Sequence, residues 1–326
     1  MISIITCSYN PSELLFNRLI SAIAHLQSPF EVFEWLIVDN NSTIPIKDRF
    51  DFSFIRHRVH FINEKSQGLT NARIAGSKAS SGKWLIFLDD DNEPAPDFII
   101  ELVKGIENHP QVTCWGPGNI QVEFVGGTVS SWFTEHKEYY QERREETKFD
   151  NRKYMQACYP IGTGLCIKKD CMESYIEAVE TGNYSIKDRT GQSLLSGGDT
   201  QIVLHNQKAG NFSGKLKQLK LTHMIEARKA GYKYLKKQKY WTASSYKLVL
   251  KQVYGDFDVE NNTGFNYRNI QNLIRQFYYE IKVNRKDIKA SYLVVCSRLG
   301  EYNANVVAGH GKKNKLFSIL EKLLIN

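Results

Sequence analysis

Short apolar runs alternate with amphipathic stretches through about the first 115 residues of the chain. Apolar runs of about four to eight residues that end in polar turns are typical of buried parallel strands. In the amphipathic stretches, apolar residues recur at helical spacing, as Leu15, Leu19, Ile23 and Leu26 do. This alternation predicts an α/β fold with a mostly parallel, Rossmann-like sheet flanked by helices. The predicted strands are 2–7, 35–38, 59–62, 84–88 and 112–115, with helices through 12–26 and 72–79 and from about residue 96.

The strand at Trp84–Leu88 ends in three consecutive carboxylates, Asp89, Asp90 and Asp91. Ligands of open α/β sheets bind beyond the carboxyl ends of the strands. Adjacent carboxylates repel one another, so a divalent cation with oxygen ligands is a natural partner, and it commonly accompanies a phosphorylated substrate. An exposed acidic turn is the alternative. No GxGxxG motif follows the first strand, which argues against a dinucleotide-binding sheet.

Four segments of this region together resemble the nucleotide-binding half of family 2 glycosyltransferases. The similarity is close over about the first 120 residues and continues more loosely to about residue 230. It implies a GT-A fold and transfer of a sugar from a nucleoside-diphosphate donor with inversion at the anomeric carbon. The four segments, which match in order and spacing, are Thr6–Asn10, Val38–Ser42, Gly68–Arg73 and Phe87–Asp91.

The resemblance also implies a donor site and a metal site. Asp39 would accept hydrogen bonds from the nucleotide base, and Arg73 would reach the nucleotide. Each assignment has a structural alternative: Asp39 could cap a turn, Arg73 could lie on a solvated helix face, and His223 could be a structural histidine. The implied donor-binding residues are Thr6, Tyr9, Asp39, Arg73, Asp89, Asp90 and Arg228, and the implied ligands of Mn²⁺ or Mg²⁺ are Asp91, Asp89 and His223.

Inverting transfer also needs a carboxylate that takes the proton from the attacking hydroxyl group. Asp199 follows two glycines at the start of a predicted helix and is the candidate base, although the same pattern suits a helix cap. The family usually carries Glu-Asp here, whereas this chain has Gly198-Asp199, a difference that bears on acceptor binding. The predicted acceptor-side residues are Gly162, Thr163 and Gly164, which form a turn, and Trp115, which could stack on a sugar or lie in the core.

The basic charge of the chain is local. Residues 208–251 hold twelve Lys or Arg and one acid, Glu226, so their net charge is +11, and the rest of the chain is −3 against a total of +8. Such a segment could attract the donor and a lipid-linked acceptor, dock on an anionic membrane, bind nucleic acid, or be a solvated face. We rank membrane attraction first and expect no nucleic acid.

The C-terminal part is predicted to be helical. We expect a catalytic domain over 1–235 and a basic helical region over 236–326, with helices at 240–253, 267–283 and 288–299. The amphipathic tail 312–325 could lie on a membrane, pair with another subunit, or cover the protein's own core. Residues 134–153 are dense in both signs of charge and predict a mobile loop on the acceptor side or a solvated helix.

Cysteine usage and hydropathy bear on the compartment. The six cysteines show no CxxC spacing, which indicates reduced thiols in a cytosolic protein. We expect no signal peptide, because the chain starts directly in a strand, and no apolar run approaches the ~20 residues that cross a bilayer. The QxxRW signature of processive enzymes is also missing at 238–241. A cytoplasmic enzyme that adds one sugar per encounter is therefore expected. Peripheral contact with the inner face of the membrane is compatible with this expectation.

The sequence thus predicts a metal-dependent glycosyltransferase, with a UDP-sugar donor and a saccharide or lipid-linked acceptor, acting in polysaccharide or glycolipid synthesis. Three alternatives remain open. A nucleic-acid-binding protein would explain the basic segment but not Asp39 or Asp89–Asp91. A nucleotide-sugar pyrophosphorylase should carry a basic, glycine-rich signature after its first strand, where this chain has Ser8–Pro11. A binding module without activity is the third.

Overall fold

The computed structural model describes residues 2–29, 33–185, 188, 196–255, 265–283, 287–307 and 313–325. The chain divides into two compact units, each described by itself below. The sheet unit comprises Met1–Lys187 and Gly198–Arg228, and the helical unit comprises Asp188–Gly197 and Lys229–Asn326. A division at residue 235, as the sequence suggested, would cut the helix α8 (Tyr232–Tyr254), because that helix begins before it.

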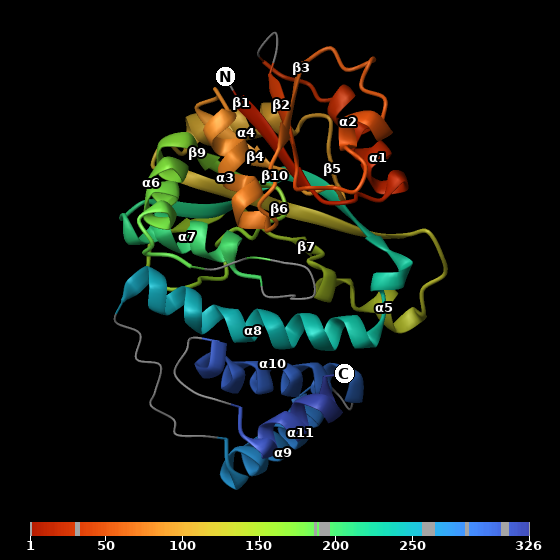
Figure 1. Ribbon diagram of the computed structural model, residues 1–326, viewed down its shortest axis with the longest axis vertical. Helices are drawn as coiled ribbons and strands as arrows, with labels where there is room; N and C mark the ends of the chain where they lie inside the picture. Colours follow the sequence, from red (N-terminus) through yellow and green to blue (C-terminus); the bar gives the residue numbers. More distant parts are fainter. Residues whose placement is uncertain are drawn as a thin grey trace. The chain divides into compact units, whose positions relative to one another are not determined.

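In the described residues of the sheet unit, ten strands form one twisted central sheet (Figure 1). Its main strand order is β3-β2-β1-β4-β9-β6-β10-β5. The first four strands of this order are mutually parallel, whereas β9 is antiparallel to both β4 and β6, and β5 is antiparallel to β10. The sheet is therefore mixed. Its predicted parallel part consists of the first four strands in the chain, β1 to β4. The strands are β1 (Ile2–Ser8), β2 (Glu34–Asp39), β3 (Arg58–Asn63), β4 (Trp84–Phe87), β5 (Asn92–Pro94), β6 (Val112–Val125), β7 (Arg143–Arg144), β8 (Lys148–Asp150), β9 (Leu165–Lys168) and β10 (Phe212–Glu226).

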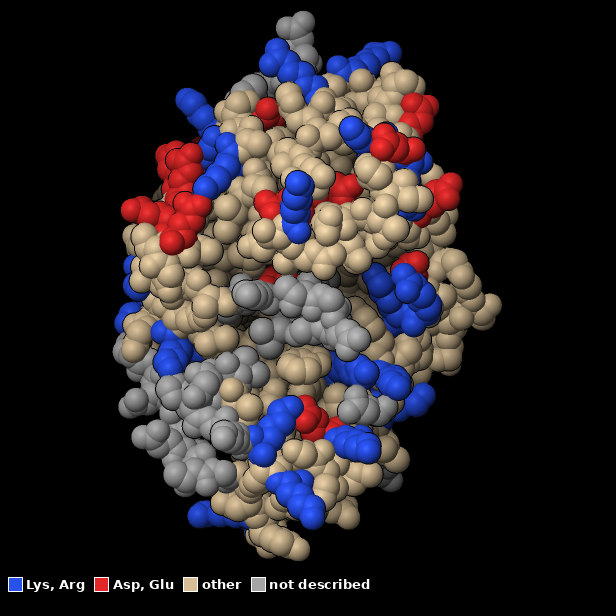
Figure 2. All heavy atoms as spheres, in the orientation of Figure 1, with Lys and Arg blue, Asp and Glu red and all other residues tan. Residues whose placement is uncertain are grey.

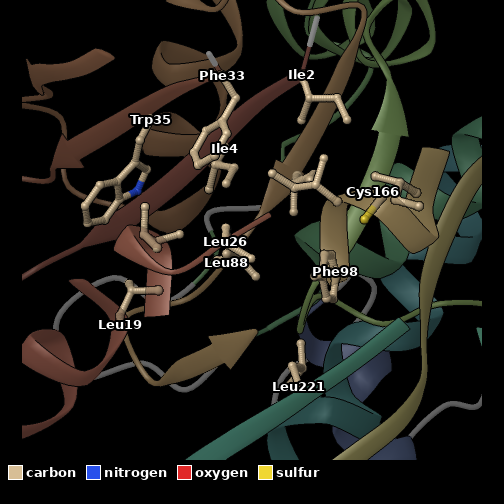
Figure 3. Packing of buried hydrophobic residues seen from close by; sticks show 14 of the residues in the cluster. Ile2, Ile4, Leu19, Leu26, Phe33, Trp35, Leu88, Phe98, Cys166 and Leu221 are labelled. Atoms are coloured by element: carbon tan, nitrogen blue, oxygen red, sulfur yellow. The ribbon is translucent and has the colours of Figure 1, made fainter. Parts of the chain in front are cut away.

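Alternation along β1 sends side chains to both faces of the sheet. Ile4 belongs to the apolar cluster under α1 and α4, while Ile5 faces α3, where an added Cβ on Gly76 would lie 2.6 Å from it. Trp35 and Phe98 are fully buried in the same cluster as Ile4 (Figure 3). The helices of this unit are α1 (Glu13–Ala24), α2 (Ile46–Arg49), α3 (Leu69–Ala79), α4 (Phe98–Asn108), α5 (Ser131–Glu135), α6 (Lys169–Glu180) and α7 (Gly198–Lys208), with short 3₁₀ turns η1 (Lys137–Tyr140) and η2 (Ala227–Lys229), the latter reaching into the helical unit.

The prediction of a loop or plain helix over 134–153 is wrong. This segment contains η1 and two short strands, of which β7 pairs with β6 and β8 pairs with β10. Glu142 accepts a hydrogen bond from the Val122 amide at 3.0 Å, and Lys137 Nζ donates to the Val122 carbonyl at 2.8 Å. A local pattern of charges does not indicate that a segment pairs with a strand distant in sequence, so the sequence did not predict β7 and β8.

The helical unit is built from α8 with α9 (Tyr267–Val283), α10 (Ile288–Val307) and α11 (Lys315–Leu324). Helix α8 ends at Gly255, whose left-handed φ of 72° suits a glycine cap. A small core joins these helices around Tyr240, Leu273, Leu299 and Phe317. In the described part of the chain, no helix is both long enough and apolar enough to cross a membrane. All six cysteines are free thiols.

Candidate active site

The site lies where the strand order reverses. Strand β1 lies between β2 and β4, so the chain leaves β1 toward one side of the sheet and later returns on the other. In such sheets the carboxyl ends of the two central strands flank a crevice that binds ligands. Ser8, the last residue of β1, lies in register with Asp39, the last residue of β2. Asp89 follows Leu88 directly, and the Leu88 amide donates to the Ile5 carbonyl at 3.0 Å.

The turn after β2 is held by two side chains. Asp39 accepts hydrogen bonds from the amides of Ser42 and Ile46, at 2.8 and 2.9 Å. Asn40 is 6 % exposed, donates to the carbonyls of Glu64 and Ser66, and accepts from the Gly68 amide at 2.8 Å. Asp39 therefore caps its turn, as the structural alternative proposed, and each oxygen keeps a second lone pair for a ligand.

The three consecutive aspartates contact three different partners. Asp90 accepts a hydrogen bond from the Ser8 hydroxyl group at the end of β1. Asp89 lies 3.9 Å from Arg73 Nη2, and Arg73 is only 4 % exposed on α3. Asp91 Oδ1 lies 3.6 Å from His223 Nε2 on β10. Their mutual repulsion is therefore reduced by separation and by partners from three elements.

The pair Asp91–His223 has the character of a cation site. A carbonyl oxygen can only accept, so the 2.9 Å contact between His223 Nδ1 and the Tyr140 carbonyl places a proton on Nδ1. In the neutral ring, the lone pair of Nε2 then faces the Asp91 carboxylate. Burial lowers the pKa of His223, but the Asp91 carboxylate and the Tyr140 carbonyl outweigh it, and the net pKa is raised. Two electron-pair donors that face each other favour a proton or a metal ion between them.

The Asp91 backbone is tied to the same strand as His223. The Asp91 carbonyl accepts from the Met224 amide at 2.8 Å. Asn92, which is fully buried, donates from Nδ2 to Asp91 Oδ1 at 3.0 Å and accepts the Asp89 amide at 3.2 Å. Within the described residues, no three His, Cys, Asp or Glu side chains form a complete metal site. Asp91 and His223 are thus the two side chains at this position that could hold a metal ion.

Asp199 meets Arg73 across a glycine. The Gly162 amide donates to Asp199 Oδ2 at 2.8 Å, and Oδ1 accepts from the Thr200 amide at 2.8 Å. A Cβ built on Gly162 would lie 2.8 Å from Asp199 Oδ2 and 3.2 Å from Arg73 Nη2. Any side chain at position 162 would therefore displace one of these groups. The first turn of α7, the end of β4 and α3 thus bring Asp199, Asp89 and Arg73 to one place.

The turn before β9 is shaped by a second glycine. Gly164 has a left-handed φ of +69°, and a Cβ there would lie 2.6 Å from Leu221 and 2.7 Å from Pro117. Between the glycines, Thr163 is 3 % exposed and donates to Gln141 Oε1 at 2.5 Å. The predicted turn therefore exists, and its position beside Asp199 requires both glycines.

Comparison with known proteins identifies the family. Residues 3–176, more than half of the 326 residues, match the family described as Glycosyl transferase family 2. The chain belongs to glycosyl transferase family 2. The family resemblance read from the sequence is thereby confirmed, and the structure confirms the expected α/β fold with C-terminal helices.

Three similar proteins illustrate the range of this glycosyltransferase's relatives. A glucosyl-dolichyl phosphate glucuronosyltransferase of Haloferax volcanii is 23 % identical over 273 residues, which are 80 % of each chain. An uncharacterized glycosyltransferase of Haemophilus influenzae is 34 % identical over 112 residues, 34 % of this chain and 36 % of that protein. The crystal structure of S. aureus TarS 1–349 in complex with UDP is similar at a TM-score of 0.48 and 12 % identity, over 94 % of this chain and 91 % of that one.

Two of the residues predicted for the glycosyltransferase site, Trp115 and Arg228, do not have the surroundings that the sequence suggested. Trp115 is fully buried, and its ring centroid lies 5.9 Å from that of Phe149 in an edge-to-face arrangement. The core alternative is therefore the one observed, and the acceptor-side assignment of Trp115 is wrong. Trp115 points to the core because alternation along β6 puts it on the face covered by α4. Arg228 has a side chain that is 76 % exposed and donates to Glu226 at 2.6 Å, a partner that the sequence did not suggest.

The other two donor-side predictions stay as predictions. Tyr9 follows β1 directly and is 53 % exposed beside the turn after β2. Thr6 is buried, and its hydroxyl group accepts from Trp35 Nε1 at 3.0 Å, so only its backbone is available to a ligand.

Sequence reasoning missed Ser8, Asn40, Asn92 and Gln141 as parts of the site. All four act by positioning a named site residue or its loop. Ser8 and Asn40 lie inside the segments that carried the family resemblance, so their place in the chain was a signal. Gln141 had none, because it reaches Thr163 only through the pairing of β7 with β6.

Proposed function

We propose that this family 2 glycosyltransferase moves one sugar from a nucleoside-diphosphate donor, with UDP as the expected nucleotide, to a hydroxyl group of an acceptor, with inversion at the anomeric carbon. The observation that carries the proposal is the meeting of Arg73, Asp89 and Asp199 at Gly162, next to the switch point of the sheet. Arg73 supplies a positive charge for the diphosphate of such a donor, and a carboxylate lies close by for the reaction at the sugar.

A divalent cation fits beside this cluster. Asp91 and His223 offer an oxygen and a nitrogen donor that face each other. Mg²⁺ and Mn²⁺ in such sites are commonly held by one or two protein ligands together with substrate phosphates. Because the described residues form no group of three His, Cys, Asp or Glu side chains around a metal position, we expect the metal to bind tightly only together with the donor. When bound, it would neutralise charge on the departing nucleoside diphosphate.

Asp199 is the proposed base. Its two oxygens are fixed by the amides of Gly162 and Thr200, which orient the carboxylate and leave lone pairs for the acceptor proton. In inverting chemistry this proton is taken on the side of the sugar opposite to the leaving group. Arg73, buried and beside Asp89, is proposed to contact the donor.

The acceptor is proposed to be a saccharide, lipid-linked in its natural form. The relative from Haloferax volcanii is named for a sugar attached to dolichyl phosphate, which supports this class. The chain spans 80 % of that relative. A role in the synthesis of a cell-surface polysaccharide or glycolipid would follow.

Calorimetric titration tests the donor site first. UDP, GDP, dTDP and CDP would each be added to the full chain without metal, with Mn²⁺ and with Mg²⁺, and Asp91→Ala and Asp39→Ala would be measured alongside. We expect one nucleotide to bind with a metal-dependent affinity that both substitutions lower. If no nucleotide binds in the presence of either Mn²⁺ or Mg²⁺, the proposal is wrong.

A further inference from the structure

Helix α9 exposes two rows of side chains to solvent. Residues spaced by seven or eleven are about two or three helical turns apart and fall in one row. The apolar row, with exposed fractions of 77, 51 and 65 %, consists of Tyr267, Ile274 and Tyr278. The cationic row lies beside it, is also exposed, and consists of Arg268, Arg275 and Lys282.

The apolar row continues the buried face of α9 beyond the part that its neighbours cover. On that buried face, Leu273 is 6 % exposed in the core of the helical unit, and the Phe277 ring lies 6.4 Å from Tyr292 of α10. Single exposed apolar residues are ordinary, but three in one row on one helix form a patch. The fold of the unit therefore does not use the full width of the apolar arc of α9.

The cationic row of α9 also lacks acidic partners in the described part of the chain. In the part of the chain that the structure describes, none of its three members forms a salt bridge. The helical unit as a whole contains nineteen Lys and Arg against eight Asp and Glu. Figure 2 shows basic side chains with few acidic ones among them over the visible face of this unit. The row therefore lies in a strongly positive surrounding.

We propose that the apolar and cationic rows of α9 form a docking face for the surface of an anionic lipid bilayer. Amphipathic helices with cations beside an apolar stripe lie in the plane of the bilayer interface. Tyrosine is favoured at this depth, because its ring is apolar and its hydroxyl group stays hydrated. Arg and Lys at the edge of the stripe contact the anionic headgroups.

Charge decides between this partner and a second copy of the chain. In a symmetric pair, the same patch meets itself, so cationic rows would lie close to one another and repel. An anionic bilayer instead compensates every cation of the row. The proposal does not depend on the donor or acceptor of the sheet unit.

Vesicle flotation of the full-length protein tests the proposal. The vesicles are phosphatidylcholine alone or phosphatidylcholine with 30 mol % phosphatidylglycerol, at about 50 and 500 mM salt. One variant carries Arg268→Gln, Arg275→Gln and Lys282→Gln, and a second carries Tyr267→Ser, Ile274→Ser and Tyr278→Ser. The matched control removes two Arg and one Lys of the sheet unit that lie outside residues 208–251, each exposed and outside any salt bridge of the described residues: Arg56→Gln, Arg58→Gln and Lys83→Gln.

The expected result is salt-sensitive binding to the anionic vesicles. The charge variant should bind about 100-fold more weakly at low salt, since each basic residue near such a surface contributes about a factor of five. The affinity of the apolar variant for the vesicles should fall by roughly tenfold or more. The control should bind about as tightly as the parent does. Circular dichroism checks that both variants fold.

Three results would overturn the proposal. The first is a parent protein that does not bind anionic vesicles, and the second is α9 variants that bind as well as the control. The third is a parent that sediments as a dimer and α9 variants that sediment as monomers, since the face would then be an interface between copies.

Discussion

His223 Nε2 on β10 lies 3.6 Å from Asp91 Oδ1, the last of three consecutive aspartates after β4. The Tyr140 carbonyl fixes the other ring nitrogen as a donor at 2.9 Å. The pair thus joins the two halves of the sheet unit, the parallel half that ends at Asp91 and the later half that carries His223. The contact brings together two of the three predicted metal ligands, which lie more than a hundred positions apart in the sequence.

Replacement of His223 by alanine should weaken Mn²⁺ binding in the presence of nucleotide. Loss of a nitrogen donor leaves Asp91 as the main protein ligand, and we expect an affinity about 10- to 100-fold lower. Calorimetric titration of Mn²⁺ into the protein in the presence of saturating nucleotide measures this affinity. His25→Ala, at an exposed position after α1, is the control. Equal Mn²⁺ affinity in the two variants would show that His223 is a structural histidine only.

Asp199→Asn should lower kcat by about 10²- to 10⁴-fold, the range of general base catalysis. The affinity for the donor nucleotide should stay within about twofold, because asparagine has the same shape and keeps one of the two oxygens that accept from the amides of Gly162 and Thr200. The control is Asp170→Asn, since Asp170 is also the second residue of a helix, α6, but its side chain is 75 % exposed. If the activity of Asp199→Asn stays within tenfold of that of the parent, Asp199 is a helix cap and not the catalytic base.

Alanine at the two glycines of the turn before β9 should have different effects. Gly162→Ala should lower activity at nearly unchanged stability, because its Cβ would push against Asp199 Oδ2. Gly164→Ala should destabilise the fold by about 2–3 kcal/mol, because its Cβ meets Leu221 and Pro117 at a positive φ.

Gly210→Ala is the control for backbone strain, since Gly210 has a φ of +83° with nothing within 4 Å of an added Cβ. We expect it to cost only about 1–2 kcal/mol. Urea unfolding gives the stabilities, and a transfer assay with the nucleotide-sugar identified by calorimetry gives the activities. A Gly162→Ala enzyme with full activity would contradict the close approach of Asp199.

Asn40→Ala should reduce both stability and nucleotide binding. The substitution removes two donors and one acceptor that tie the turn after β2 to the loop before α3. We expect a loss of about 2–3 kcal/mol in the free energy of unfolding. Asn71→Ala is the control, because exposed Asn71 also donates to the Ser66 carbonyl, at 3.2 Å. A similar small loss in both variants would rule out the proposed role of Asn40.

The stability of the sheet unit should fall in acid partly through Glu34. Burial raises its pKa, but hydrogen bonds from Ser3 and Ser81 outweigh burial, and the net pKa is lowered. A lowered carboxylate pKa contributes stability above the pKa of the unfolded chain, about 4.3, and this contribution is lost as the pH falls through the folded value. Glu34→Gln should therefore be less stable at pH 7, by about 1–3 kcal/mol, and lose less on acidification.

Urea unfolding between pH 3 and pH 7 measures this difference. Glu107→Gln, at an exposed position on α4, is the comparison. Parallel pH profiles for the parent and Glu34→Gln would mean that Glu34 makes no contribution to acid sensitivity.

The sequence by itself determined the parallel half of the sheet and the location of its polar strand ends. Short apolar runs followed by Asp39 and Asp89–Asp91 are local patterns, and parallel pairing brings such ends to one edge of the sheet. The positions of α9 and of the helix that begins near Asp199 were also readable, because helical periodicity is local.

Only the tertiary structure decided which side chains meet. Strand pairing across the sheet placed Gln141 against Thr163, and it placed His223 against Asp91, which only the family resemblance had put at one site. No local pattern encodes a contact between such distant residues. It also moved Trp115 into the core, since the face on which a strand residue points depends on register. The uncovered rows of α9 likewise appeared only after packing, because amphipathicity gives the width of an apolar arc but not how much of it a neighbour buries.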